Sequence, residues 1–292
     1  MTSETKIAIA KAWVPSHITG FFAAHRHEKP HLSGSVGAGL CLSLGAATTV
    51  EPAPDLEKTE IFLNGEAGEA PVSRFVADRL AGDRGPVRLM TQLDMPLGAG
   101  FGASGAGALG AAYALNSCFD LGLTANQAAA LAHEAEVIHR TGLGDVIAQN
   151  SGGLVVRLYP GAPGTGKIDR IPAPPLPISY VVRGPISTRK VLSDAGTMKA
   201  VNSAGKRALK ELLKKPTFAN FMRLSHRFTL VSGLASDWAL QAIEAVEAAG
   251  GRASMIMLGD AVFAWGEESE KALRAFGEVH TTMVSQRGAN LD

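Results

Sequence analysis

Apolar positions along the chain follow two spacings, and the spacing separates predicted strands from predicted helices. Short apolar runs and alternating apolar and polar positions, bounded by turn residues, are typical of strands. The first such segment is expected to end at Pro15, because proline cannot donate a hydrogen bond within a central ladder. The predicted strands are 6–14, 39–50, 61–63, 87–94, 154–158, 178–182 and 279–284, with a hairpin of 253–258 and 262–265 around Gly259-Asp260.

Apolar residues three and four positions apart, in segments rich in alanine and leucine, predict helices. Thr124 is a candidate N-cap of the helix 125–139, since Gln127 stands where a capping box needs it. Strands come first, helices follow in pairs and strands return, an order that favours an α+β fold over a doubly wound parallel sheet. The proline-rich and glycine-rich stretch 159–177 is the best candidate for a domain boundary. The predicted helices are 72–80, 105–118, 125–139, 198–213, 218–230, 238–249 and 270–276.

Composition and charge narrow the class of protein. The chain has 292 residues, of which 46% are apolar, enough for one large domain or two that share a cleft. A net charge of +1 gives no basic field that would attract nucleic acid or anionic lipid. Cys41 and Cys118 lie in apolar surroundings and are expected to be reduced. We find no signal peptide or membrane span in the pattern, so we expect a cytoplasmic protein.

A glycine-rich run from Pro96 to Ala106 lies between a predicted strand and a predicted helix. Gly98, Gly100 and Gly102 occupy alternate positions, so the backbone can bend and its N–H groups can converge. Because the next helix presents its positive end, this arrangement suits phosphate. Ser104 supplies a hydroxyl for magnesium or a phosphate oxygen. No lysine follows, as a P-loop would need, and a plain glycine-rich turn with a capping serine stays open as the alternative.

A second glycine-rich turn, 141–145, ends in Asp145 and follows the helix 125–139. An aspartate there is often only a turn former. Close to an anion-binding loop, the aspartate becomes a candidate for a catalytic role. Phosphoryl transfer needs one carboxylate near the attacking hydroxyl and another to hold magnesium. Glu134 and Glu136 on the helix are two positions apart, so they cannot both face one site.

The segment 15–22, Pro-Ser-His-Ile-Thr-Gly-Phe-Phe, places hydroxyls and an imidazole beside a pair of phenylalanines. This mixture suits a pocket for a small acid with an apolar body. Histidines at 17, 25, 27 and 31 raise a metal cluster as the alternative, although no carboxylate or thiolate accompanies them at helical ligand spacing.

With these motifs assembled, the chain resembles the GHMP kinase superfamily. The run 96–106 is similar to its second motif, Pro-x-x-x-Gly-Leu-Gly-Ser-Ser-Ala-Ala, with Phe101, Ala103 and Gly105 as departures. The resemblance implies that this loop binds ATP. The contacts it implies are Pro96, Gly98, Ala99, Gly100, Phe101, Gly102, Ala103, Ser104 and Gly105.

The same resemblance implies the metal site, the catalytic residue and the fold. The segment 131–137 is similar to the helix that carries a magnesium ligand, which places Glu136 with Ser104 on Mg²⁺ and leaves Glu134 outside. Asp145, followed by Gly152-Gly153, matches the catalytic aspartate. The implied fold is α+β with two lobes and the active site between them. A ribosomal-protein-like βαβ lobe, 1–160, binds ATP, and a ferredoxin-like lobe spans 161–292.

Within the superfamily the chain is most similar to the archaeal pantoate kinases, through 15–22, 37–41, 183–188 and 253–259. The last segment lacks the dense glycine run of the usual third motif. The likeness implies transfer of the ATP γ-phosphate to the terminal hydroxyl of pantoate in coenzyme A biosynthesis, with Asp145 orienting or deprotonating that hydroxyl. By residue type, the candidates for substrate contacts are Ile18, Thr19, Phe21 and Phe22, with Arg26, His17 or Arg189 for the carboxylate.

Three other functions stay open. The chain could be a GHMP kinase for another small alcohol, such as homoserine or mevalonate, or a catalytically inactive ligand sensor. Retention of Asp145, Glu136 and Ser104 argues against the sensor. The third is an RNA-binding domain, against which the near-neutral charge and the lack of a basic patch argue. A homodimer is also open, because the apolar stretch 253–265 suits either core or interface.

Overall fold

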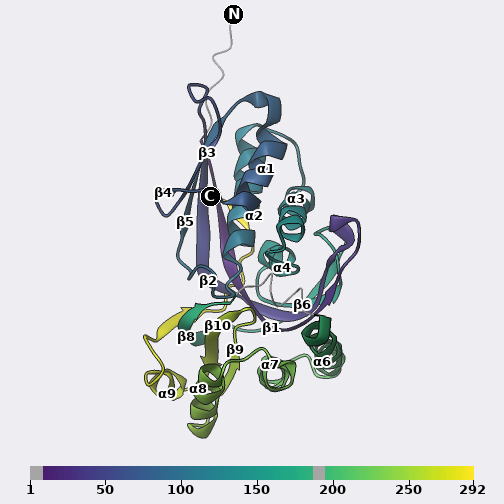
Figure 1. The fold of residues 1–292 in the computed structure, drawn as a ribbon, viewed down its shortest axis with the longest axis vertical. Coiled ribbons are helices and arrows are strands. Elements are labelled where there is room, and N and C mark those ends of the chain that lie inside the picture. The colour runs from purple at the N-terminus through teal and green to yellow at the C-terminus, as the bar shows by residue number, and fades with distance from the viewer. Residues whose placement is uncertain (1–8, 187–194) are drawn as a thin grey trace, which may run out of the picture.

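The computed structural model describes residues 9–186 and 195–292, and these form two lobes, each a sheet with helices packed against it (Figure 1). The predicted α+β class and the two-lobed arrangement are confirmed. None of the helices in the described ranges is long and apolar enough to cross a membrane. The predicted strand 6–14 begins in residues outside these ranges. Arg189, a candidate for the substrate carboxylate, also lies outside them.

The larger sheet lies in the upper lobe of Figure 1 and is antiparallel except where β3 pairs with β5. Its order is β12-β1-β2-β5-β3-β4, while β6 pairs with β2 and β7 with β6. The long strand β2 bonds to β6 through its first half and to β5 through its second. The strands are β1 Ala10–His25, β2 Gly34–Pro52, β3 Glu60–Leu63, β4 Glu66–Ala67, β5 Val87–Leu93, β6 Leu154–Tyr159, β7 Lys167–Ile171 and β12 Asn290–Leu291.

The prediction that the first strand ends at Pro15 is wrong, because β1 continues to His25. The register of β1 on β2 shifts between Pro15 and Ser16, so a bulge accommodates the proline. On the other side of β1, β12 pairs only with Ala12 and Trp13, so no ladder needs the N–H that Pro15 lacks. As a consequence, 16–22 are strand residues with fixed directions.

Helices cover one face of the larger sheet (Figure 1). The alanines and glycines of α2 let it pack directly on β2, since a Cβ at Gly110 would lie only 2.5 Å from Thr48 Oγ1. The predicted capping box of Thr124 and Gln127 is confirmed at the start of α3. These helices are α1 Pro71–Ala81, α2 Ala103–Cys118, α3 Ala125–His139 and α4 Asp145–Ser151, with 3-10 turns η1 Pro30–Leu32 and η2 Gly82–Arg84.

The smaller lobe contains the sheet β11-β8-β10-β9 and the remaining described helices. The predicted hairpin is confirmed, but its turn is 256–258 and precedes Gly259. Both strands of the hairpin are mostly buried within this lobe, so the stretch 253–265 serves as core. The elements are β8 Pro177–Pro185, β9 Arg252–Met255, β10 Gly259–Trp265, β11 His280–Met283, α6 Ala195–Lys214, α7 Phe218–Ser232, α8 Asp237–Ala248 and α9 Ser269–Leu273.

One hydrophobic core cluster spans both lobes, and the smaller lobe has a second cluster of its own. The far half of β1 stays paired with β2 and lies over α6 and α7 (Figure 1). There Phe21 and Phe22 both pack against Phe228, with ring centroids 6.5 and 5.9 Å away. Strand β7, inside the stretch that suggested a domain boundary, belongs to the upper sheet, and β8 belongs to the lower one. The boundary itself, at 160 and 161, stays a prediction.

Candidate active site

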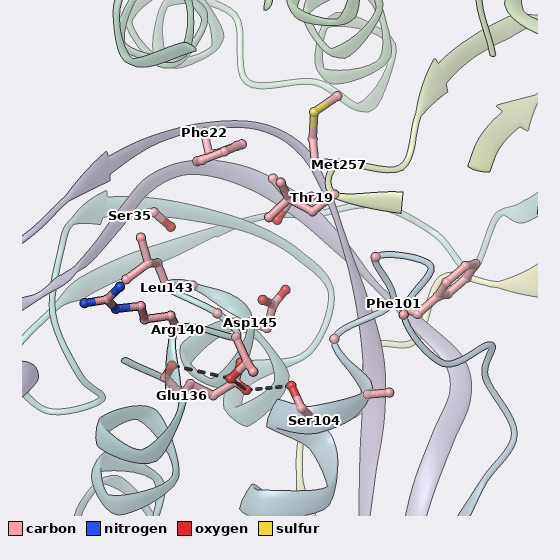
Figure 2. Close-up of a pocket in the computed structure, with 18 of the residues that line it drawn as sticks. Thr19, Phe22, Ser35, Phe101, Ser104, Glu136, Arg140, Leu143, Asp145 and Met257 are labelled. Atoms are coloured by element: carbon pink, nitrogen blue, oxygen red, sulfur yellow. Dashed lines mark hydrogen bonds between the residues drawn. The ribbon is translucent and has the colours of Figure 1, made fainter. Parts of the chain in front are cut away.

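A pocket of about 340 Å³ lies where the two lobes meet. The glycine-rich loop, the end of α3 and the turn before α4 form one side, while β1, β6 and the β9–β10 turn form the other. Figure 2 shows Ser104 and Glu136 facing Thr19, Phe22 and Met257 across the pocket, with Asp145 between them. The segments predicted to carry chemistry therefore converge at one place.

The glycine-rich loop has a backbone that requires its glycines. Gly98, Gly100 and Gly102 have φ angles of 71°, 84° and 69°, the left-handed region in which side chains are strained. A Cβ at Gly100 would lie 2.6 Å from the carbonyl oxygen of Met257, so the loop also packs closely on the β9–β10 turn. Gln149 on α4 donates a hydrogen bond to the carbonyl of Gly102 (2.9 Å). The loop is thus held open at the N-terminus of α2, where free N–H groups can bind phosphate.

Glu136 lies beneath this loop, buried and bonded through one oxygen. Its Oε1 accepts hydrogen bonds from Ser104 Oγ and Thr141 Oγ1, each 2.6 Å long (Figure 2). Its Oε2 faces Gly142, where a Cβ would collide with it and would also approach Asp145 Oδ2. Burial, together with the nearby charge of Asp145, raises the pKa of Glu136 to about 7. Two carboxylate oxygens therefore face one small space that only a glycine leaves open.

Asp145, the first residue of α4, is bonded to the buried imidazole of His17. Its Oδ1 lies 2.8 Å from His17 Nδ1, and 23% of its side-chain surface stays exposed to the pocket. Burial raises the pKa of Asp145, but the hydrogen bond from His17 and the charge of Arg157 outweigh it, so the pKa lies below its ordinary value. Burial lowers the pKa of His17. We conclude that the ionised carboxylate of Asp145 accepts a hydrogen bond from the neutral imidazole of His17.

Arg157, on β6, is a buried guanidinium that lines the pocket. Its Nη1 and Nη2 make only long hydrogen bonds, each of 3.4 Å, to His17 Nε2 and Thr19 Oγ1. Its Nε is buried and has no partner within the described residues. Burial lowers the pKa of Arg157 to about 10, which leaves it charged near neutral pH. A buried cation with such weak bonding calls for an anion.

Arg157 was not among the residues selected from the sequence. It lies inside the predicted strand 154–158, in the run Leu-Val-Val-Arg-Leu, and such a strand gives no sign of a site. The available signal was the arginine itself, because arginine is almost never fully buried unless it is paired.

Comparisons with known proteins agree with this geometry. Residues 71–153 match the GHMP kinases N terminal domain, and residues 208–284 match GHMP kinases C terminal. The pantoate kinase of Thermococcus kodakarensis is 39% identical over 282 residues, which cover 93% of each chain. The chain belongs to the GHMP kinases. A pantoate kinase of Methanospirillum hungatei JF-1 is 35% identical over 281 residues, 95% of this chain and 94% of that one.

Solved structures of other proteins share the fold. One described as a phosphotransferase related to the CoA biosynthesis pathway is 35% identical, with a TM-score of 0.86 over 98% of this chain and 99% of that chain. A homoserine kinase from Cytophaga hutchinsonii is 15% identical, with a TM-score of 0.72 over the whole of both chains. The second likeness concerns the fold alone.

The remaining residues selected from the sequence fall in several places in this GHMP kinase. Gly98, Gly100, Phe101, Gly102, Ala103, Ser104, Thr19 and Phe22 line the pocket. Pro96, Ala99 and Gly105 lie beside the lining residues but are not part of it, and the ring of Phe101 packs on Tyr180 at 5.0 Å. Ile18 and Phe21 belong to the core, and Arg26 is exposed past the end of β1. Glu134 is half-buried and does not line the pocket.

The histidines do not form a metal cluster in the part of the chain that the structure describes. His17 and His25 are eight residues apart on one strand, a separation of about 26 Å at the usual rise of a strand. No three His, Cys, Asp or Glu side chains within 9–186 and 195–292 come together in a way that could hold a metal ion. Any metal in the pocket would therefore be held by at most two carboxylates, a pattern typical of magnesium completed by phosphates and water.

Proposed function

We propose that this GHMP kinase transfers the γ-phosphate of ATP to the terminal hydroxyl of pantoate, giving 4-phosphopantoate for coenzyme A biosynthesis. The observation that carries the proposal is Arg157, a buried and poorly bonded cation that lines the same pocket as Asp145 and the glycine-rich loop. Pantoate has a carboxylate at one end and a hydroxyl at the other. The names of the relatives at 33–39% identity support the same substrate.

At the acid end, Arg157 would pair with the substrate carboxylate. Its nitrogens lack short hydrogen bonds, and a planar guanidinium matches a carboxylate in two places at once. Arg26 lies exposed past the end of β1 and does not line the pocket, so we leave it out of the substrate set. His17 is fully buried and already bonded to Asp145, so we do not assign it to the carboxylate either.

The wall beside Arg157 is apolar. Phe22, Leu143 and Met257 line it, from β1, the turn before α4 and the β9–β10 turn. Burial of the two methyl groups of pantoate there would contribute about 0.8 kcal/mol for each carbon. Homoserine keeps the carboxylate and the terminal hydroxyl, but it lacks the two methyl groups and carries an ammonium where pantoate has its second hydroxyl, which would bring a second positive charge toward Arg157. The wall and the cation together favour a branched hydroxy acid.

At the hydroxyl end, Asp145 would orient the attacking oxygen. His17 occupies Oδ1, so Oδ2 is directed to the pocket and can accept the hydroxyl proton. As the substrate oxygen bonds to the γ-phosphorus, the bond from that phosphorus to the β,γ-bridging oxygen breaks and ADP leaves. The proton passes to Asp145, whose lowered pKa keeps it ionised beforehand.

ATP and magnesium fit the other end of the pocket. The backbone N–H groups at residues 98–104 and the N-terminus of α2 would bind the phosphates. Glu136 and Ser104 offer oxygen ligands of the kind magnesium prefers, with Gly142 leaving room for an ion. When bound, the ion offsets negative charge on the phosphates. A structure of this fold, described as MDDEF in complex with MVAPP, AMPPCP and magnesium, has a TM-score of 0.74.

The test is ADP release with pantoate, the primary amide of pantoate, homoserine and mevalonate as acceptors, with the product identified by ³¹P NMR. We expect kcat/KM for pantoate to exceed that for its amide by about 100-fold, the range expected when a buried charge loses its partner. Homoserine and mevalonate keep the carboxylate but lack the branched body of pantoate, and we expect both to react more slowly than pantoate. Faster turnover of homoserine or mevalonate would overturn the substrate, and turnover of none would overturn the kinase.

A further inference from the structure

We infer that His17 is a positioning residue, which fixes the orientation of the Asp145 carboxylate and joins it to Arg157. The inference rests on the proposed function for the role given to Asp145. His17 is 0% exposed and does not line the pocket, so it cannot contact a substrate directly. Any effect of its side chain on the reaction must pass through the residues that it contacts, and its two hydrogen-bond partners are Asp145 and Arg157.

The two ring nitrogens of His17 have different partners, and these define one tautomer. Nε2 faces Nη1 of Arg157 at 3.4 Å, and a guanidinium can only donate, so Nε2 must accept. The proton therefore lies on Nδ1, which donates to Asp145 Oδ1 at 2.8 Å. The result is a chain from Arg157 through His17 to Asp145 that runs in one direction.

The ring of His17 is also held in place by its surroundings. Gly39 lies on the neighbouring strand β2, and a Cβ there would meet the ring, with Cε1 only 2.9 Å away. The backbone N–H of His17 donates to the carbonyl of Phe101 at 3.0 Å, which ties this point of β1 to the glycine-rich loop. With the ring fixed and Oδ1 occupied, Oδ2 is the oxygen of Asp145 that is left for a substrate hydroxyl.

One imidazole thus sets the spacing between both ends of the acceptor site. Arg157 would bind the substrate carboxylate and Asp145 would bind the substrate hydroxyl. His17 is hydrogen-bonded to both Arg157 and Asp145. This spacing would select hydroxy acids of one length. A merely structural histidine would affect the stability of the fold but not the relation between these two groups.

The experiment compares two substitutions that each keep half of the imidazole. In His17→Asn the amide nitrogen can take the position of Nδ1 and still donate to Asp145, but nothing faces Arg157. In His17→Gln the amide reaches the position of Nε2, and the donor to Asp145 is lost. We expect His17→Gln to lower kcat about 100-fold, whereas His17→Asn keeps kcat within about tenfold and mainly raises the KM for pantoate. The KM for ATP should stay within about threefold in both.

The chain contains a matched control in a second pair of histidine and carboxylate. His226 Nδ1, on α7, lies 3.2 Å from Glu247 Oε1, on α8, and neither residue lines the pocket. His226→Asn and His226→Gln should leave kcat and both KM values within about twofold. Equal losses of kcat in the two His17 variants, or no loss in either, would overturn the inference.

A second measurement does not depend on the substrate. ¹⁵N NMR of the histidines near neutral pH should show His17 in the wild type as a neutral ring with its proton on Nδ1, assigned by the loss of that signal in His17→Gln. A protonated ring, or a proton on Nε2, would overturn the inference even if pantoate is the substrate. Conversely, an enzyme that ignores pantoate but shows the Nδ1–H ring would fail the proposed function alone, and the two His17 variants would then be compared on the acceptor it uses.

Discussion

The two ends of the pocket are built in different ways. The phosphate end comes from short continuous segments, the loop at 96–106 and the turn at 141–145, and it works largely through backbone groups. The acid end takes single side chains from distant parts of the chain, such as Thr19 on β1, Arg157 on β6 and Met257 in the other lobe. A site made of backbone groups needs glycines at defined positions, so the local sequence reveals it. A site made of distant side chains forms only when the strands that carry them have paired.

The electrostatics of the two ends differ as well. At the phosphate end Glu136 is buried and makes no ion pair within the described part of the chain, and burial raises its pKa to about 7. Toward the acid end Asp145 lies near Arg157 and is bonded to His17, and its pKa falls below the ordinary value. Carboxylates whose pKa values are moved in opposite directions have separate roles. Under the proposed function, Glu136 would hold the metal ion and Asp145 would act as the base.

The largest effect is expected at Asp145, where the two ends meet. Asp145→Asn keeps an oxygen to accept from His17 but has no carboxylate for the hydroxyl proton. We expect kcat to fall about 1,000-fold, the middle of the range for loss of a general base, with the KM for ATP nearly unchanged. Steady-state ADP release measures both constants.

Asp237→Asn is the matched control, since Asp237 is exposed and also opens a helix, α8. It should leave kcat unchanged. If Asp145→Asn weakened ATP binding as much as it lowered kcat, Asp145 would belong to the phosphate end rather than to the junction.

The contrast between the ends also explains what the sequence could predict. The strand, glycine-rich loop and helix around 96–118 were predicted because periodicity and glycine spacing are local signals. Glu136 rather than Glu134 faces the pocket, as the resemblance implied. Arg157 escaped notice because a strand residue reveals its surroundings only through the register of β6 on β2. The end of β1 was misplaced for the same reason: whether Pro15 breaks a ladder depends on a neighbour far along the chain.

Arg157→Met tests the acid end, and its effect should be the next largest. Methionine fills the volume without a charge, so the substrate carboxylate would be buried unpaired. We expect kcat/KM for pantoate to fall about 100-fold, while the KM for ATP changes by less than about threefold, because the phosphate end keeps all its groups. With the uncharged amide of pantoate as the substrate, the same substitution should lower kcat/KM much less.

Arg170→Met provides the control, because Arg170 lies on the adjacent strand β7 and is exposed. Its kinetic constants should match those of the wild type. Equal losses with pantoate and with its amide would show that Arg157 supports the fold of the pocket rather than the carboxylate.

The smallest expected effect is a pH dependence of magnesium affinity that turnover does not share, which distinguishes the phosphate end from the acid end. If Glu136 holds magnesium as proposed, it must do so in its ionised form, and its pKa of about 7 means that this form predominates above neutral pH and is lost as the pH falls. Between pH 8 and pH 6 the apparent affinity for magnesium should therefore drop about tenfold. Turnover at saturating magnesium should change little over this range, because the lowered pKa of Asp145 keeps that carboxylate ionised. In Glu136→Gln, the only pH dependence of magnesium affinity that remains should be that of ATP itself. Ser104→Ala should weaken magnesium binding a few-fold but retain the pH dependence that Glu136 causes. A magnesium affinity that is equally pH-dependent in Glu136→Gln would place the titrating group, and with it the metal, elsewhere in the pocket.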